Sequence, residues 1–325
     1  MNELNKKFWT EEFYDMAYDI VKDRKFPILI PSFNRPDPIV MKKMFSDMTD
    51  EYNYPIFIFV RESQRADYEK NLTNKFAKII SIPDEEINSA GKTRQGSLMW
   101  LYNNGYEKAF TIDDDIPKIG FSVKGVTGKG TLVSKDGPEL LSAKVFAMWQ
   151  LAMEVAIEKY DIVYSGIRVH SQAWQLPNTD EDKSMLYCSG LSAGVVCWNV
   201  KELVERGLKY EDNKISGFDD TDFVIKLVAG RNLVCSFPFL WYDMPSDIVS
   251  VQNFDFDTVE ERFRTSTEIV KRNHGDKEFV RYKVDKRGIP GVGINWVRVR
   301  KMFGIDKFRY NIWKDIEDKI GGKYE

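Results

Sequence analysis

Four short apolar runs, separated by stretches with helical periodicity, constrain the fold of the first 115 residues more than any other feature. The runs cover residues 26–30, 56–60, 78–82 and 109–112. They are too short for helices and are bounded by turn-forming residues, which is typical of buried strands. The stretches between them, at 39–48, 65–76 and 88–104, have the pattern of helices. This alternation predicts a parallel, doubly wound sheet with right-handed crossovers.

The later part of the chain adds further predicted elements. Helices are predicted at 3–24 and 138–160, strands at 162–167 and 234–238, and a strand or strand pair within 185–198. Residues 119–137 are rich in Gly, Lys, Ser and Thr, and we expect them to form a mobile loop.

Three consecutive carboxylates, Asp113, Asp114 and Asp115, follow the fourth apolar run directly. Adjacent carboxylates at the exit of a strand repel one another, and a divalent cation with oxygen ligands is the usual way to stabilise them. In an open α/β sheet, ligands bind at the carboxyl ends of the strands. A solvated acidic turn is the alternative interpretation.

A second acidic group, Asp219, Asp220 and Asp222, lies in the first turn of a predicted helix. The helix dipole favours one acid at this position. Three acids exceed what capping needs, so the segment is a second candidate for catalysis or binding.

Composition excludes several classes of protein. No stretch of about 18 apolar residues is present, so no membrane span is expected, and residues 1–23 lack the apolar core of a signal peptide. Cys188, Cys197 and Cys235 have apolar surroundings and indicate reduced core residues of a cytosolic protein. With two histidines in 325 residues, a His-rich metal site is excluded. A P-loop ATPase is excluded because Glu86 stands where the motif before Gly91 needs Gly.

The net charge of −3 hides a strong asymmetry. Residues 281–310 contain nine Lys or Arg against two Asp, a net charge of +7, whereas residues 1–280 sum to −9. A cationic segment on an acidic body favours a polyanionic partner, although a solvated helix face has the same composition.

Several motifs together resemble a known family. Pro31-Ser32-Phe33-Asn34-Arg35 follows the first strand, and Gly91-Lys92-Thr93-Arg94 starts a helix. Asp113–Asp115 resembles the Asp-x-Asp motif of nucleotide-sugar glycosyltransferases with the GT-A fold, and Asp219–Phe223 resembles the Glu-Asp-x-Asp-Leu element of inverting family 2 enzymes. The opening around residues 30–36 is similar to the phage DNA-modifying group related to the TET-associated glycosyltransferases, which attach sugars to hydroxymethylated pyrimidines.

The resemblance implies an α/β fold of the GT-A, Rossmann-like type, with a mostly parallel central sheet flanked by helices and a helical, basic C-terminal extension. It divides the chain into a glycosyltransferase domain at 1–250 and an extension at 251–325 that is basic at 281–310. Within the domain it places an N-terminal helix at 1–24, a nucleotide-sugar-binding half at 25–118 and an acceptor-binding half at 119–250.

The resemblance also implies a donor site. Asp115 would bind Mn²⁺ or Mg²⁺, Asp113 would contact the metal or the nucleotide ribose, and His274 would complete the metal shell, with a plain surface histidine as the alternative. The remaining donor-binding candidates hold the base or the phosphates of a UDP-sugar: Phe33, Asn34, Arg35, Glu62, Lys92, Arg94 and Asp114. For Lys92 and Arg94, solvated side chains are the alternative.

Catalysis by inversion needs a base for the acceptor hydroxyl. By resemblance Asp220 has this role, with Asp219 and Asp222 as competitors. Trp174, Trp296, Arg298 and Arg300 are the acceptor-binding candidates. The expected protein is therefore a cytoplasmic, metal-dependent enzyme (in the host cytoplasm if it is viral) that moves glucose or a pentose such as arabinose onto DNA. A glycan, lipid or protein acceptor, and a non-catalytic nucleic-acid-binding protein, are the alternatives.

Overall fold

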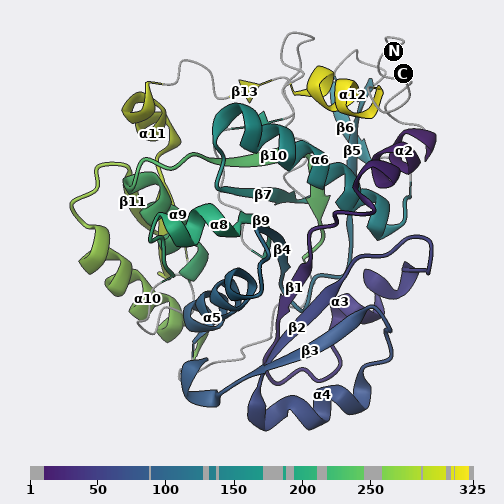
Figure 1. Ribbon diagram of the computed structural model, residues 1–325. Coiled ribbons are helices and arrows are strands. Elements are labelled where there is room, and N and C mark those ends of the chain that lie inside the picture. The colour runs from purple at the N-terminus through teal and green to yellow at the C-terminus, as the bar shows by residue number, and fades with distance from the viewer. Residues whose placement is uncertain are drawn as a thin grey trace.

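The structure is a computed structural model, described here for residues 11–87, 89–126, 132–136, 139–170, 186–187, 194–210, 218–244, 258–286, 288–304, 309–310 and 312–321. Strands and helices alternate through the first half, as Figure 1 shows. The strands there are β1 (Ile28–Pro31), β2 (Ile56–Arg61), β3 (Ala77–Ile82) and β4 (Lys108–Ile112). The helices are α2 (Glu11–Val21), α3 (Ile39–Lys42), α4 (Arg65–Asn71) and α5 (Ala90–Asn103), with 3-10 turns η1 (Phe45–Asp47), η2 (Glu62–Gln64) and η3 (Asp84–Glu86).

The second half extends the same sheet. Its strands are β5 (Ile119–Val126), β6 (Leu132–Asp136), β7 (Tyr164–Val169), β8 (Leu186–Tyr187), β9 (Val195–Asn199), β10 (Val234–Tyr242) and β13 (Arg309–Tyr310). Its helices are α6 (Ser142–Tyr160), α8 (Val200–Glu205), α9 (Asp219–Ala229) and α12 (Trp313–Gly321). Between β10 and β13 lie α10 (Val259–His274), the strands β11 (Val280–Val284) and β12 (Pro290–Ile294), and α11 (Trp296–Phe303).

The central sheet has the order β13-β8-β10-β7-β9-β4-β1-β2-β3. β1 pairs in parallel with β2 and β4, and β2 with β3, which confirms the predicted parallel half. β9 is antiparallel to both β4 and β7, and β10 is parallel to β7. A mixed sheet of this kind, flanked by helices, confirms the predicted fold class.

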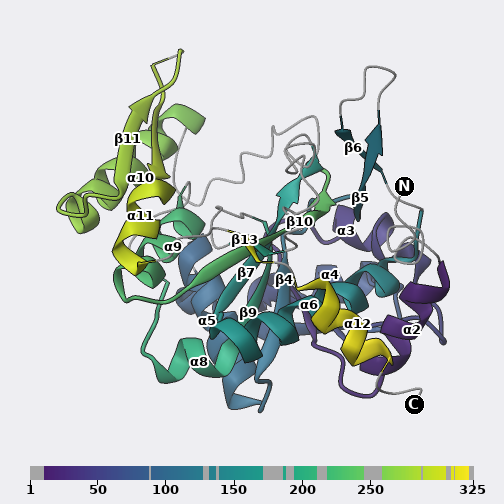
Figure 2. The ribbon, with the colours of Figure 1, turned by 90° about the horizontal axis from the view of Figure 1, so that it is seen from above.

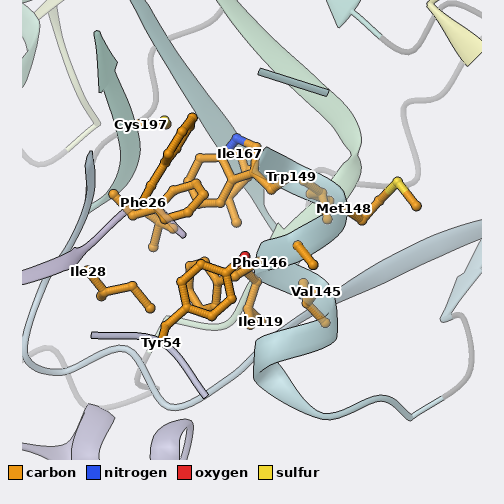
Figure 3. Close-up of a cluster of buried hydrophobic side chains, with 14 of the residues drawn as sticks. Phe26, Ile28, Tyr54, Ile119, Val145, Phe146, Met148, Trp149, Ile167 and Cys197 are labelled. Carbon is orange, nitrogen blue, oxygen red and sulfur yellow. The ribbon is translucent and has the colours of Figure 1, made fainter. Parts of the chain in front are cut away.

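Two apolar clusters cover the two faces of the sheet. One contains side chains of α2, α6 and α12, and Figure 3 shows its centre around Phe26, Phe146 and Trp149. The other contains side chains of α5, α8 and α9. Along β1, Ile28 and Ile30 belong to the first cluster and Leu29 to the second, as the alternation of side chains in a strand requires.

The mobile loop predicted at 119–137 is wrong for the described part of that segment. β5 and β6 form an antiparallel hairpin, and β5 also pairs with the end of β10. Ile119 and Phe121 alternate with small residues, a strand pattern that the abundance of Gly and Ser conceals in composition. Gly120 is needed there, because a Cβ atom would lie 2.5 Å from the Trp241 ring.

The other predictions on the body have these outcomes. Cys197 and Cys235 are buried free thiols, and Cys188 lies outside the described residues. None of the helices in the described ranges is long and apolar enough to cross a bilayer. The segment predicted as one helix at 39–48 is split into α3 and η1. This break lets Asp47 reach the start of α6. There its carboxylate accepts hydrogen bonds from the amide and the hydroxyl of Ser142 at 2.7 and 2.6 Å.

The C-terminal part returns to the body. α10, the β11–β12 hairpin and α11 pack beside α9, and the chain then adds β13 to the sheet next to β8. α12 finally packs against α6 and α2. The extension predicted to begin at residue 251 is thus in contact with both faces of the sheet.

Candidate active site

The candidate site lies at the carboxyl ends of the parallel strands. β1, β2 and β4 run in the same direction, so the segments that follow them meet at one edge of the sheet. These segments are the loop Ser32–Arg35, the turn η2 and the acidic triple Asp113–Asp115. The sequence motifs predicted for the donor site are therefore brought together by the topology.

Asp114 is turned into the protein. Its carboxylate accepts hydrogen bonds from Ser32 Oγ at 2.6 Å and from Arg35 Nη1 at 2.5 Å, and its backbone carbonyl accepts from the Val40 amide at 3.1 Å. Burial raises its pKa to about 6, against the lowering effect of Arg35 and Ser32. Asp114 therefore fixes the loop after β1 in place, and its contact with the donor stays a prediction.

Asp113 and Asp115 remain open to solvent, with side chains that are 37% and 26% exposed. Arg94 Nη2 lies 2.9 Å from one oxygen of Asp113, and Arg35 Nη1 lies 3.2 Å from one oxygen of Asp115. The other Asp113 oxygen faces Gly194, where a Cβ atom would approach to 3.0 Å. Gly194 has φ +82°, so both its backbone conformation and the space beside Asp113 favour glycine.

The buried guanidinium of Arg94 connects the two acidic motifs. Besides Asp113, it reaches Asp219 Oδ2 through Nε at 2.9 Å and Asp220 Oδ2 through Nη2 at 3.4 Å. Arg94 comes from the second turn of α5, whose start is capped by Ser89 Oγ accepting from the Lys92 amide at 3.2 Å. The three carboxylates hold the pKa of Arg94 well above its ordinary value, against the effect of burial.

The three acids of α9 have different environments. Asp222 is fully buried, with Oδ1 2.8 Å from His274 Nε2 and Oδ2 3.0 Å from Lys226 Nζ. Asp219 is held by Arg94, whereas Asp220 Oδ1 has no hydrogen-bond partner among the described residues. Burial raises the pKa of Asp220 well above its ordinary value, and the charges of Asp219 and Asp113 add to the effect.

The charge balance of the site leaves room for a cation. Asp113, Asp114, Asp115, Asp219 and Asp220 are five carboxylates, and they contact two guanidinium groups. No group of three His, Cys, Asp or Glu among the described residues is placed to hold a metal, so His274 does not join Asp113 and Asp115 as we predicted. Mg²⁺ is commonly bound by one or two carboxylates and substrate phosphates. The half-exposed Asp113 and Asp115 fit that mode.

The predicted base-binding loops meet above β1 and β2. Arg61 lies 4.2 Å from the centre of the Phe33 ring, and the Asn34 amide donates to Gln64 Oε1 at 3.1 Å. Asn34 has φ +53°, in the left-handed region that Asn tolerates. Glu62 is exposed at the start of η2. Lys92, two residues before Arg94, lines a groove of about 680 Å³ between β3 and α5.

Two residues near the acids were not predicted. Tyr242, the last residue of β10, is buried, and the charges of Asp113, Asp220 and Asp115 contribute to the raised pKa of its hydroxyl. Arg262 lies in the first turn of α10, and its buried Nε has no hydrogen-bond partner among the described residues. Burial lowers the pKa of Arg262, and the charge of Asp219 opposes this effect. No local sequence pattern marks either residue, since their place depends on how the elements pack.

Three of the four predicted acceptor residues, Trp296, Arg298 and Arg300, lie on α11. Trp174 lies outside the described residues. Trp296 is half-buried and packs on the apolar cluster beneath α9 and β12. Arg298 donates from Nη1 to the Glu278 carbonyl at 2.6 Å, and Arg300 is half-buried in the same helix. The structure therefore gives α11 a packing role as well as its charge.

Comparisons with known proteins give one family and a set of distant structures. The sequence profile described as TET-Associated Glycosyltransferase matches residues 26–246. No curated protein sequence matches the chain.

Among solved structures, the chain is similar to glucosyl-3-phosphoglycerate synthase from Mycobacterium tuberculosis in complex with UDP, with 10% identity over 88% of this chain and 92% of that one and a TM-score of 0.46. Mannosyl-3-phosphoglycerate synthase from Rubrobacter xylanophilus has 9% identity over 86% and 90% of the two chains and a TM-score of 0.42. TarS from S. aureus has 12% identity and a TM-score of 0.40, and the match covers 77% of this chain but 39% of TarS.

Proposed function

The chain belongs to the TET-associated glycosyltransferase family, and from this premise we propose that it transfers a sugar from a UDP-sugar to a hydroxymethylated pyrimidine base in DNA. The family makes the protein a glycosyltransferase that uses a nucleotide-sugar donor. The acceptor in this proposal is supported by the family's association with TET enzymes and by the cationic segment at 281–310.

The observation that carries the proposal is the bridge made by Arg94. It places Asp113, at the exit of β4, and Asp220, at the start of α9, around one guanidinium. A donor bound beside Asp113 would then lie next to Asp220, whose carboxylate can accept the proton of the acceptor hydroxyl. Because Arg94 is buried and rigidly held, the two motifs keep this spacing.

We propose that Asp113 and Asp115 would hold a Mn²⁺ or Mg²⁺ ion next to the donor diphosphate. When bound, such an ion neutralises the charge that develops on the leaving diphosphate. Arg262 would bind a donor phosphate oxygen as well, since its buried Nε makes no hydrogen bond within the described ranges. Its guanidinium lies 5.1 Å from the centre of the Phe263 ring and within electrostatic reach of Asp219. A buried donor without a hydrogen bond is costly, and an anionic ligand that accepts from Nε would remove that cost.

Asp220 is the base in this mechanism. It takes the proton of the acceptor hydroxymethyl group, the acceptor oxygen bonds to the anomeric carbon, and the bond to the diphosphate breaks, which releases UDP with inversion. Asp220 suits this role better than Asp222 because its side chain is 11% exposed, whereas Asp222 is fully buried, with Oδ1 2.8 Å from His274 Nε2 and Oδ2 3.0 Å from Lys226 Nζ. A raised pKa also brings a base closer to working pH.

The test is donor turnover with a defined acceptor. The protein is incubated with UDP-glucose, UDP-arabinose and a set of other UDP- and GDP-sugars with Mn²⁺, and nucleotide diphosphate release is measured with hydroxymethylcytosine DNA, unmodified DNA or no DNA. Release that requires the hydroxymethylated DNA supports the proposal and identifies the sugar. Equal release with and without that DNA overturns the DNA acceptor and favours a glycan, lipid or protein acceptor.

A second arm tests the metal. Asp115→Asn should abolish Mn²⁺-dependent turnover, because it removes one of two carboxylates that face the donor. Asp50→Asn is the matched control, since Asp50 is an exposed carboxylate that pairs with Lys75 near the amino ends of β2 and β3, at the opposite edge of the sheet. Turnover of Asp115→Asn equal to that of Asp50→Asn would contradict the metal assignment.

A further inference from the structure

The β11–β12 hairpin has two different faces. Tyr282 pairs with Val292, and Val280 pairs with Ile294, so these residues share one face. Val292 and Ile294 are buried in the cluster that includes α9 and α10, and Tyr282 Oη donates to the Val270 carbonyl at 3.5 Å. This face anchors the hairpin to the body.

The opposite face carries two cations and two glycines. Arg281 pairs with Gly293, and Lys283 pairs with Gly291. Both cationic side chains are exposed, and β12 contributes no side chain on this face. The result is a flat strip on which positive charge lies beside bare backbone.

The fold does not account for these glycines. Neither has a positive φ angle, a Cβ atom on Gly293 would meet nothing within 4 Å, and one on Gly291 would make an ordinary 3.5 Å contact with Lys283 Cε. Glycine inside a strand costs roughly 0.5–1 kcal/mol relative to Ala. Glycine in a strand often marks a place where a ligand or another backbone approaches closely.

The charges on this strip are unneutralised. Arg281, Lys283 and Lys286 are exposed and form no ion pair within the described part of the chain, and residues 280–294 contain four Lys or Arg against one Asp. The acids that influence Tyr282, Asp276 and Glu268, are on the side of the hairpin that faces α10. By contrast, Arg298 on α11 is engaged by the Glu278 carbonyl.

We infer that the flat face of the β11–β12 hairpin, formed by Arg281, Lys283, Gly291 and Gly293, is a docking surface for the sugar-phosphate backbone of DNA. The inference rests on the proposed function and assigns acceptor binding to the hairpin in place of α11. Figure 2 shows the hairpin projecting from the body beside α10 and α11, where it is accessible to a long polymer. Phosphate contacts of this kind position a duplex without reading its sequence.

The hairpin also packs directly against α9, the helix that carries the proposed base. β12 contacts both α9 and α10, and His274 at the end of α10 lies 2.8 Å from Asp222 in the first turn of α9. DNA held on the hairpin therefore has a fixed position relative to Asp220, two residues before Asp222.

The first test removes the charges. Binding of the full-length protein to unmodified duplex DNA is measured by fluorescence anisotropy over a range of salt concentrations for Arg281→Ala/Lys283→Ala. We expect weaker binding and a salt slope that is shallower by about 2, because two phosphate contacts are lost. Lys70→Ala/Lys78→Ala, with the same charge change on exposed residues of α4 and β3, should bind as the wild type does.

The second test adds a side chain to the flat face and leaves its charges unchanged. Gly293→Leu should weaken DNA binding, whereas its unfolding free energy should equal or exceed that of the wild type, since the site is open. Unchanged DNA binding by both hairpin variants would overturn the inference while leaving the proposed function intact. A wild-type protein that neither binds nor glycosylates DNA would overturn both, and donor hydrolysis without DNA would then show that the enzyme itself is active.

Discussion

Arg94 Nε lies 2.9 Å from Asp219 Oδ2, although 125 positions separate the two residues in the sequence. The same guanidinium contacts Asp113 and Asp220, so one side chain from α5 fixes the distance between the end of β4 and the start of α9. Two halves of the sheet are joined at the site through this residue.

Replacement of Arg94 should therefore destabilise the protein. Arg94→Met leaves three acids without their shared counter-charge, and breaking a buried ion pair costs about 3–5 kcal/mol of unfolding free energy. Urea unfolding measures the effect. Arg65→Met, which removes an exposed pair with Glu69 on α4, should cost at most about 1 kcal/mol. Equal stability of the two variants would contradict the bridging role of Arg94.

Two isosteric substitutions on α9 should have opposite effects. Asp220→Asn should lower turnover by about 10²–10⁴ because it removes the proposed base, and its stability should be unchanged or higher since a buried carboxylate with a raised pKa becomes neutral. Asp222→Asn should lower the unfolding free energy by about 1–3 kcal/mol by weakening its contacts with His274 and Lys226. Kinetics and thermal unfolding of both variants check this, and a stable, fully active Asp220→Asn variant would exclude Asp220 as the base.

Arg262 and Arg264 offer a matched pair on α10. Arg262→Met should raise KM for the donor without loss of stability, because its buried Nε makes no hydrogen bond within the described structure and its proposed partner is a donor phosphate. Arg264 is 60% exposed and pairs with Glu260, so Arg264→Met should leave KM unchanged. Donor titrations at saturating acceptor provide the measurement. A large loss of stability in Arg262→Met would instead indicate a structural role.

Asp47 should contribute to stability but not to chemistry. It accepts from both the amide and the hydroxyl of Ser142, so it caps α6 from a distant segment. Asp47→Ala should lower the unfolding free energy by about 1–2 kcal/mol, the usual value of a lost cap, and leave kcat unchanged. Chemical unfolding with a parallel activity assay tests this, and a change in kcat larger than the change in stability explains would refute it.

The strands of the first half could be predicted because each is a short, continuous apolar run. β1 to β4 lie within two residues of their predicted positions. The β5–β6 hairpin could not be predicted in the same way, because Gly and Ser dilute its pattern and β5 pairs with β10, more than a hundred residues later. The β11–β12 hairpin could not be predicted either, because its many charged residues interrupt the apolar pattern of a strand.

The residues of the site could be predicted from sequence motifs, but their spatial arrangement could not. Sequence placed Asp113, Asp114 and Asp115 together, yet only packing decides that Asp114 points inward to Arg35 while its neighbours stay open. His274 was expected at a metal, and its actual partner, Asp222, became visible only when α10 was placed against α9. Arg262 belongs to no motif, since what marks it is a buried Nε that makes no hydrogen bond within the described residues.

The packing of α12 on α6 has a consequence for synthesis of the protein. Ile312, Ile316 and Ile320 complete an apolar cluster whose other members precede them in the chain, and Lys319 Nζ reaches Glu158 Oε1, 161 positions earlier, at 2.8 Å. On the ribosome, α6 emerges well before these residues. The part of its apolar surface that α12 covers therefore stays exposed during translation of the intervening chain, and transiently exposed apolar surface of this kind is what chaperones bind.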